Sequence, residues 1–414
     1  MLWLAVQTPP PGEVPYVAIA APAPGVSTCP DGLCGTEALD GVFAALEGLE
    51  TGARDQPVHI LQIGDSHTAG DRITGALRAR LQARFGAAGR GVLPPGVPYA
   101  GYAPYQVQVE ATAWPATPAA PLGPYAAPAE RTGLSGTRAW AGGPAARLIL
   151  TAEPGAAFDV LALCGDGGPA AGMIAVTSEA GMQVEDFRAE QDQPLCLRQT
   201  FDRPVAQAML TPMGAVALHD IRLERRAPGV IVSNLGVVGS GLRDLAGRDE
   251  AIVAVELAAW RPALVILAYG VNNGFDPALD PVAYEGLLRG QVERLRRLAP
   301  AASLMLLGAP EGLKGGQVGG CGADGTRRAP ANLALVRDVQ RRVAADMGVA
   351  FWDWHGRMGG DCSAERLATM AEPYMRPDRV HFTSVGADWI GGMLSDDLAT
   401  AYERWKARTV EAAD

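Results

Sequence analysis

The sequence predicts a parallel, three-layer α/β fold that is interrupted by an all-β sandwich. Two patterns indicate this fold. Up to residue 104 and again from residue 228, short apolar runs typical of buried strands alternate with stretches of helical periodicity, as in parallel α/β sheets. Between about 105 and 227, apolar and polar residues alternate with a period of two between Gly/Pro turns, and no helical pattern intervenes. A chain of 414 residues with 48% apolar residues is long enough for both units.

The α/β elements are expected in a regular order. A helix at 36–50 precedes a first strand at about 58–64 and a second helix at 71–85, after which we interpret Gly86–Gly91 as a helix cap and turn. From residue 230 strands and helices alternate, and they are expected in order at 230–234, 242–259, 264–270, 281–298, 303–308, 331–347, 349–354 and 384–408. The result is a five-stranded parallel sheet, whose ligand site should lie outside the carboxyl ends of the strands.

The interruption is expected to contain about seven short strands, at a spacing typical of a β-sandwich. They lie near 106–110, 146–150, 158–163, 173–176, 194–197, 206–210 and 216–223. Trp114 and Trp140 fall in this region and could stack on sugar rings, but a tryptophan in a sandwich is more often part of the core, and we favour the core.

These patterns divide the chain into four segments. Residues 1–35 form a Pro/Ala-rich N-terminal segment, 36–104 the first part of the α/β domain, 105–227 the inserted sandwich, and 228–414 the second part of the α/β domain. The α/β domain is therefore expected to be assembled from two separated stretches of sequence.

Charge and hydropathy exclude two classes of function. The net charge is -10 and the pI is near 5.1, which disfavours binding to nucleic acid or to an anionic membrane surface, because both require a concentrated basic patch. No stretch of about 18 apolar residues is present, so no transmembrane helix is expected. The oligomeric state is not encoded in any pattern that we can identify.

The six cysteines form three pairs that are local in sequence: Cys29 with Cys34, Cys164 with Cys196, and Cys321 with Cys362. Local pairing is the simplest of the 15 possible connectivities, and it predicts folding in an oxidising compartment. Six reduced cysteines in a cytosolic enzyme are the alternative. No Cys or His cluster offers a metal site instead, so neither a metal nor a cofactor is expected. The N-terminal residues lack the basic start and clear cleavage site of a signal peptide.

Ser66 lies where the first strand gives way to a helix, in the segment Gly64-Asp65-Ser66-His67. A serine at such a turn can project its hydroxyl clear of the sheet, and the N–H groups of the turn can stabilise an oxyanion. A serine that only caps the helix is the alternative reading. We expect His67 to point away from Ser66, because side chains alternate in direction along the turn.

Asp378 and His381 lie three residues apart, just before the last helix. Asp378 could accept the Nδ1 proton of His381, which leaves Nε2 to take the proton of Ser66 as general base. The alternative is a surface aspartate beside a histidine at a helix start.

Two further strand ends carry candidate oxyanion donors. After the second strand, in Asn234-Leu235-Gly236-Val237-Val238-Gly239-Ser240-Gly241, a glycine lets the backbone approach a substrate oxygen. After the third strand, the amide of Asn272 could supply a second donor. Flexible turn chemistry and a helix cap are the alternatives at these two places.

These four segments, in this order, resemble the SGNH hydrolases, also called GDSL esterases. The resemblance covers about 58–104 and 228–408, and it implies a flavodoxin-like SGNH fold in which Ser66, His381 and Asp378 form the catalytic triad. By the same resemblance the oxyanion is held by the N–H groups of Ser66 and Gly239 and by the side chain of Asn272. Gly239 is chosen over Gly236 and Gly241 for its spacing from Asn234, and Asn273 stands where many members have Asp.

The longer segment from Ile63 to Asp71, together with 81–86, is similar to the bacterial peptidoglycan O-acetylesterases. Those enzymes also carry a carbohydrate-binding-module-like β-sandwich between the first two motifs. The resemblance implies an exported serine esterase, periplasmic or in the cell envelope, that removes O-acetyl groups from a cell-wall polysaccharide through an acyl-enzyme. An O-acyltransferase with the same triad, an esterase for another acetylated carbohydrate, and an intracellular lipid or thioester hydrolase remain alternatives.

Overall fold

Five parallel strands form most of the central sheet in this computed structural model, which describes residues 21–118, 131–315, 320–322 and 325–411. The strand order is β1-β19-β16-β15-β2-β14, and β1 joins the edge antiparallel to β19. The strands are β1 (Leu33–Cys34), β2 (Val58–Gly64), β14 (Val230–Gly236), β15 (Leu264–Ala268), β16 (Ser303–Leu307) and β19 (Ala350–Trp352). The five parallel strands lie where the sequence predicts them, whereas β1 has only two residues and gives no detectable pattern. Most of the N-terminal segment, 1–20, lies outside the described residues.

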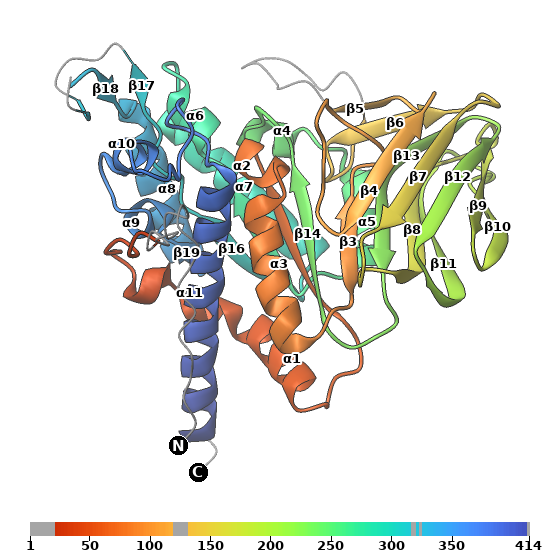
Figure 1. Ribbon diagram of the computed structural model, residues 1–414, viewed down its shortest axis with the longest axis horizontal. Coiled ribbons are helices and arrows are strands. Elements are labelled where there is room, and N and C mark those ends of the chain that lie inside the picture. The colour runs from red at the N-terminus through yellow and green to blue at the C-terminus, as the bar shows by residue number, and fades with distance from the viewer. Residues whose placement is uncertain (1–20, 119–130, 316–319, 323–324, 412–414) are drawn as a thin grey trace, which may run out of the picture.

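Helices cover both faces of this sheet (Figure 1). Successive strand residues enter different cores: Ile60 and Ile266 pack in the core with α1, α3 and α11, while Leu61 and Val265 pack in the core with α5, α7 and α8. This period of two produces three layers. The α-helices are α1 (Asp40–Glu50), α2 (Ser66–Ala69), α3 (Arg72–Phe85), α4 (Leu242–Ala246), α5 (Glu250–Trp260), α6 (Val271–Phe275), α7 (Pro281–Leu298), α8 (Ala331–Met347), α9 (Trp354–Arg357), α10 (Ser363–Ala368) and α11 (Ser384–Glu411), and the 3-10 turns are η1 (Pro30–Gly32) and η2 (Thr36–Leu39).

The predicted helix at 242–259 is two helices in the structure. The side chain of Asp249 accepts hydrogen bonds from the N–H groups of Ala251 and Ile252, and this N-cap starts α5 anew after α4 has ended. Apolar periodicity continues across the break, which is why the sequence pattern suggested one helix.

The residues between β3 and β14 build two sheets that share one apolar core, in agreement with the predicted β-rich insert. One sheet has the order β10-β9-β12-β7-β4 and the other β11-β8-β13-β6-β5, both antiparallel. Ten strands are described here rather than seven, because several are too short or too exposed to give a clear alternation. They are β4 (Val107–Thr112), β5 (Ala116–Pro118), β6 (Thr137–Ala141), β7 (Arg147–Ala152), β8 (Phe158–Gly167), β9 (Met173–Ser178), β10 (Gly181–Asp186), β11 (Gln193–Val205), β12 (Gln207–Met213) and β13 (Val216–Glu224).

The glycine-rich segment after α3 is a strand, β3 (Gly89–Leu93), and not only a turn. It pairs antiparallel with β13, with Leu93 opposite Ile221. A Cβ atom on Gly91 would lie 2.2 Å from the Oγ of Ser233 on β14, so glycine permits a close approach of two strands here. The interpretation of Gly86–Gly91 as a cap and turn was therefore wrong beyond Gly86, because glycines at a tight strand contact resemble glycines in a turn.

All three predicted disulfides are present: Cys29–Cys34, Cys164–Cys196 and Cys321–Cys362. The last one links α10 to a segment that also forms the short hairpin β17 (Lys314–Gly315) and β18 (Arg327–Arg328). Among the described residues, no helix is both long and apolar enough to cross a membrane.

Candidate active site

Ser66 is the first residue of α2, directly beyond the end of β2. Asp65 caps this helix, because its Oδ1 accepts the backbone N–H of His67 at 3.0 Å. A Cβ atom on Gly64 would lie 2.6 Å from the carbonyl oxygen of Ala268, so the tight turn requires glycine at that position. The backbone N–H of Ser66 belongs to the first turn of α2, where N–H groups have no partner within the helix. It can therefore donate to a substrate oxygen.

The structure brings Ser66, His381 and Asp378 together. The Oγ of Ser66 lies 3.0 Å from the Nε2 of His381, and the Nδ1 of His381 lies 2.8 Å from the Oδ2 of Asp378. The other carboxylate oxygen of Asp378 accepts the backbone N–H groups of His381 and Val380 at 3.0 and 2.9 Å. Partial burial acts to raise the pKa of Asp378, but these hydrogen bonds outweigh it and hold the pKa below its usual range. Asp378 is thus an ionised acceptor that can orient His381.

His67 points toward the acid-base loop, a contact that the expectation of a side chain directed away from Ser66 does not address. Its ring stacks on that of His381, with centroids 5.4 Å apart and planes at 26°. Its Nδ1 lies 3.1 Å from Oδ1 of Asp65, and its Nε2 lies 2.8 Å from the carbonyl oxygen of Val380. The sequence could not reveal this contact, because it joins residues more than 300 positions apart.

Three glycines lie at the end of β14 or in the loop after it, and their hydrogen bonds distinguish them. The N–H of Gly236 donates to Oδ1 of Asn234 at 3.2 Å, and that of Gly241 donates to Oδ2 of Asp244 at 2.6 Å. The N–H of Gly239 has no hydrogen-bond partner among the residues that the structure describes, and its φ is +77°. Gly239 is thus the one of these three glycines whose N–H remains available to a ligand.

Asn272 lies in α6, directly after β15. One hydrogen of its amide is donated to the carbonyl of Ser240 at 2.8 Å, which ties α6 to the loop that contains Gly239. A primary amide has two N–H groups, so the second N–H of Asn272 can donate to a ligand. The predicted donor is therefore also a residue that positions the Gly239 loop.

Buried polar contacts support the turn that carries Ser66. The Nδ2 of Asn234 donates to the carbonyl of Thr68 and to Oγ1 of Thr74, the latter at 2.7 Å. Asp71 is fully buried and accepts hydrogen bonds from Arg78 and Arg90, both at 2.9 Å. Burial acts to raise the pKa of Asp71, but the two guanidinium groups outweigh it and lower the pKa to about 2. The segment after Ser66 is therefore held by a charged cluster inside the protein.

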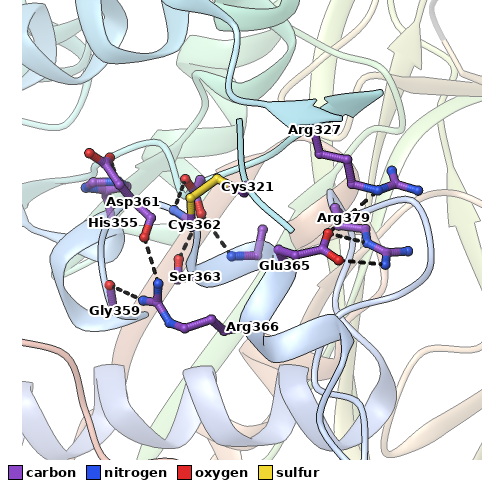
Figure 2. Close-up of a disulfide and its surroundings, with 12 residues drawn as sticks. Cys321, Arg327, His355, Gly359, Asp361, Cys362, Ser363, Glu365, Arg366 and Arg379 are labelled. Atoms are coloured by element: carbon purple, nitrogen blue, oxygen red, sulfur yellow. Dashed lines mark hydrogen bonds and ion pairs between the residues drawn. A yellow bond between two sulfur atoms is a disulfide. The ribbon is translucent and has the colours of Figure 1, made fainter. Parts of the chain in front are cut away.

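A disulfide and an ion pair support the loop that carries Asp378 and His381 (Figure 2). Arg379 has a φ of +56°, and its guanidinium forms two hydrogen bonds with Glu365 of α10, at 2.9 and 3.1 Å. Figure 2 shows that Glu365 also lies beside Arg327, and that α10 starts next to the disulfide between Cys321 and Cys362.

One group of described residues could hold a metal ion: Glu311, His355 and Asp361 offer ligand atoms within 4.8 Å of one another. Both oxygens of Glu311, however, accept hydrogen bonds from the start of α10, including the N–H groups of Cys362 and Ala364 at 2.7 and 2.9 Å. Asp361 is 91% exposed along its side chain. We interpret Glu311 as a buried cap of α10.

Comparison with known proteins supports the resemblance to the GDSL esterases noted in the sequence. Residues 215–389 match the model of the GDSL-like Lipase/Acylhydrolase family. The match begins directly before β13, so it includes Gly239, Asn272, Asp378 and His381 but not Ser66, which the insert separates from them. No curated protein matches the sequence.

Several solved structures also match the chain. The structure described as "Peptidoglycan O-acetylesterase in action, 5 min" aligns with a TM-score of 0.74 and 28% identity, over 88% of this chain and 96% of that one. An acetyl xylan esterase, AlAXEase, aligns with a TM-score of 0.30, 15% identity and coverage of 42% and 81%. A family two carbohydrate esterase from Cellvibrio japonicus aligns with a TM-score of 0.28, 12% identity and coverage of 72% and 98%. The last two scores are too low to support an argument.

Proposed function

Because the chain carries a GDSL-like lipase/acylhydrolase domain and is a carboxylic ester hydrolase, we propose that it is a serine esterase that removes O-acetyl groups from a cell-wall polysaccharide, with peptidoglycan as the substrate. The observation that carries this proposal is the hydrogen-bonded chain from Ser66 through His381 to Asp378. The likeness to a peptidoglycan O-acetylesterase over almost the whole of both chains, insert included, supports the choice of substrate.

In the proposed mechanism, Oγ of Ser66 attacks the acetyl carbonyl carbon while Nε2 of His381 accepts the hydroxyl proton. Asp378 keeps the Nδ1 proton of His381 in place and stabilises the imidazolium. The negative charge on the carbonyl oxygen is stabilised by the N–H groups of Ser66 and Gly239 and by the amide of Asn272. His381 then protonates the sugar oxygen, the C–O bond breaks, and the acetyl group stays on Ser66.

Water completes the cycle. His381 removes a proton from the water molecule, the resulting hydroxide attacks the acetyl carbon, and Ser66 leaves with the proton returned by His381, so that acetate is released. Each proton is transferred by His381 and each charge is held by backbone or side-chain donors, so every step can be assigned to residues of this chain.

The three disulfides support a place outside the cytoplasm. A periplasmic or cell-envelope location would bring the enzyme to its polymer, and this location is part of the proposal.

The direct test compares acetate release from O-acetylated peptidoglycan, from acetylated xylan and from an aryl acetate. We expect wild-type protein to hydrolyse peptidoglycan with the highest kcat/KM, and Ser66→Ala to lose at least about a thousandfold in kcat on every substrate. Ser178→Ala, on the distant strand β9, is the matched control and should retain full activity. Undiminished hydrolysis by Ser66→Ala would disprove the nucleophile, while a preference for xylan would disprove only the substrate.

A further inference from the structure

The two tryptophans of the sandwich have different environments. Trp114 is 4% exposed and belongs to the core of the sandwich, as the sequence suggests for both. Trp140, on β6, is 48% exposed. It lines a pocket of about 390 Å³ where β8 ends and where β11 and β13 begin. A half-exposed tryptophan beside a hollow therefore distinguishes this end of the sandwich from its core.

The indole ring of Trp140 is held in place by its neighbours. The guanidinium of Arg138 lies 4.0 Å from the ring centroid. It also forms an ion pair with Asp166, and the carboxylate of Asp166 lies 3.0 Å from the Nε2 of His219, within hydrogen-bond distance. Because the contact with Arg138 restricts the ring before a ligand arrives, less side-chain entropy is lost on binding.

The polar groups of the pocket are suited to hydroxyl groups. Asp166 and Asp192 present carboxylates and Gln193 presents an amide, while Ala171 and Ala217 form small apolar walls. Burial acts to raise the pKa of Asp166, but His219 and Arg138 outweigh it and lower the pKa, so the carboxylate remains an acceptor. A carboxylate has about four lone-pair positions, and two contacts leave capacity for a hydroxyl donor.

The pocket adjoins the α/β part of the molecule. Arg131 lines it and donates two hydrogen bonds to Asp249, at 2.7 and 3.3 Å, and Asp249 caps α5. Helices α4 and α5 directly follow the loop that contains Gly239. In Figure 1, β5, β6 and α4 all lie in the upper part of the view, as does α2, which starts with Ser66. Through Arg131 and Asp249 the pocket is thus connected to the helices that follow the Gly239 loop.

We propose that this Trp140 pocket binds one sugar ring of a glycan chain, separately from the ring whose acetyl group reaches Ser66. The apolar C–H face of a pyranose would stack on the face of the indole that Arg138 does not cover, and its hydroxyl groups would donate to Asp166 and Asp192. The identity of the glycan as the enzyme's substrate rests on the proposed function, whereas the pocket itself does not depend on Ser66.

Binding is tested without turnover, in a Ser66→Ala background, by co-sedimentation with purified peptidoglycan sacculi. Trp140→Ala should weaken binding at least about fivefold, whereas Trp140→Phe should retain most of it, because a phenyl ring also stacks. Met182→Ala is the matched control: Met182 is exposed on β10, in the other sheet, and its loss should leave binding unchanged. With Ser66 intact, Trp140→Ala should hydrolyse an aryl acetate within about twofold of wild type.

Sacculus binding by Trp140→Ala equal to that of its parent would overturn the proposal. Loss of aryl acetate hydrolysis by Trp140→Ala would indicate a folding defect. Asp192→Ala would then test the pocket, because Asp192 lies exposed in a loop and its replacement should not disturb folding. Unchanged binding by Asp192→Ala would then reject the pocket, and weakened binding would support it. Failure of wild-type protein to hydrolyse any acetate would reject the proposed function and would leave the binding measurement valid.

Discussion

His67 faces two acceptors at once, a carboxylate oxygen of Asp65 and a backbone carbonyl of Val380. A carbonyl cannot donate, so both ring nitrogens need a proton for both bonds to form. Burial acts to lower the pKa of His67, but Asp65 and the Val380 carbonyl outweigh it and raise the pKa. When protonated, His67 therefore links the Ser66 turn to the loop that carries His381.

Replacing His67 by Gln should lower kcat on an aryl acetate about tenfold with little change in KM, because one amide cannot reach both partners and the acid-base loop loses its position. Because the pKa of His67 is raised in the folded protein, the link is complete at low pH and is lost as the pH rises through that pKa. The difference in kcat between wild type and variant should therefore shrink at high pH. A lower Tm with unchanged kcat at all pH values would contradict this role.

The candidate site could be predicted from the sequence only in part. Ser66, Asp378 and His381 each stand at a strand or helix end that periodicity reveals, and the structure places them within hydrogen-bond distance. The supporting contacts of His67 and Glu365 could not be predicted, because they depend on how distant segments pack. Their role in catalysis stays a prediction for kinetics to test.

At the scale of elements, α10 supports the acid-base loop through Glu365 and Arg379. The left-handed φ of Arg379 is unfavourable for a residue with a Cβ atom, so this ion pair helps to hold an otherwise strained turn. The disulfide Cys321–Cys362 lies directly before α10 and restricts its position.

Glu365→Gln should reduce kcat on an aryl acetate about threefold to tenfold, because Arg379 loses its charged partner and the Asp378–His381 loop becomes less ordered. The matched control is Glu285→Gln on α7, whose carboxylate also contacts two arginines, Arg289 and Arg342, away from the site. Reduction of the disulfides should change kcat in the same direction as Glu365→Gln. Equal kcat values for the two Gln variants would argue against a positioning role for α10.

The elements that the sequence missed share physical causes. β1 has two residues, too few for any periodicity, and β3 is rich in glycine because it packs closely against β14. The break between α4 and α5 depends on a single cap, Asp249, within a continuous apolar pattern. The five parallel strands were predictable because each lies in a short, largely apolar run beside a helical period, and such patterns need no knowledge of distant contacts.

At the scale of the molecule, two buried carboxyl groups meet where the sandwich packs on the α/β part. Asp220 lies on β13 and Glu256 on α5. Burial raises the pKa of Asp220 to about 7, although Arg222 acts to lower it, and burial together with Asp220 raises the pKa of Glu256. One of the two is therefore protonated in the folded protein over much of the acidic range.

These raised pKa values make the interface sensitive to pH. In the unfolded chain Asp220 loses its proton near pH 4, so the folded state holds more protons between about pH 4 and 7 and its stability falls as the pH rises. Asp220→Asn should remove this contribution. The free energy of unfolding of the variant relative to wild type should increase by at least about 1 kcal/mol between pH 4 and pH 8, measured by urea denaturation. A constant difference across this range would contradict the assignment.

The pairing of β3 with β13 determines how the insert is attached. The chain enters the sandwich region through β3 and leaves it through β13. These two strands are hydrogen-bonded to each other, so the two connections form one paired stem. We expect this paired stem to restrict the motion of the sandwich relative to the α/β part. A glycan ring bound in the proposed Trp140 pocket would then lie at a preferred distance from Ser66. Acetyl groups at that distance along the polymer would be removed first.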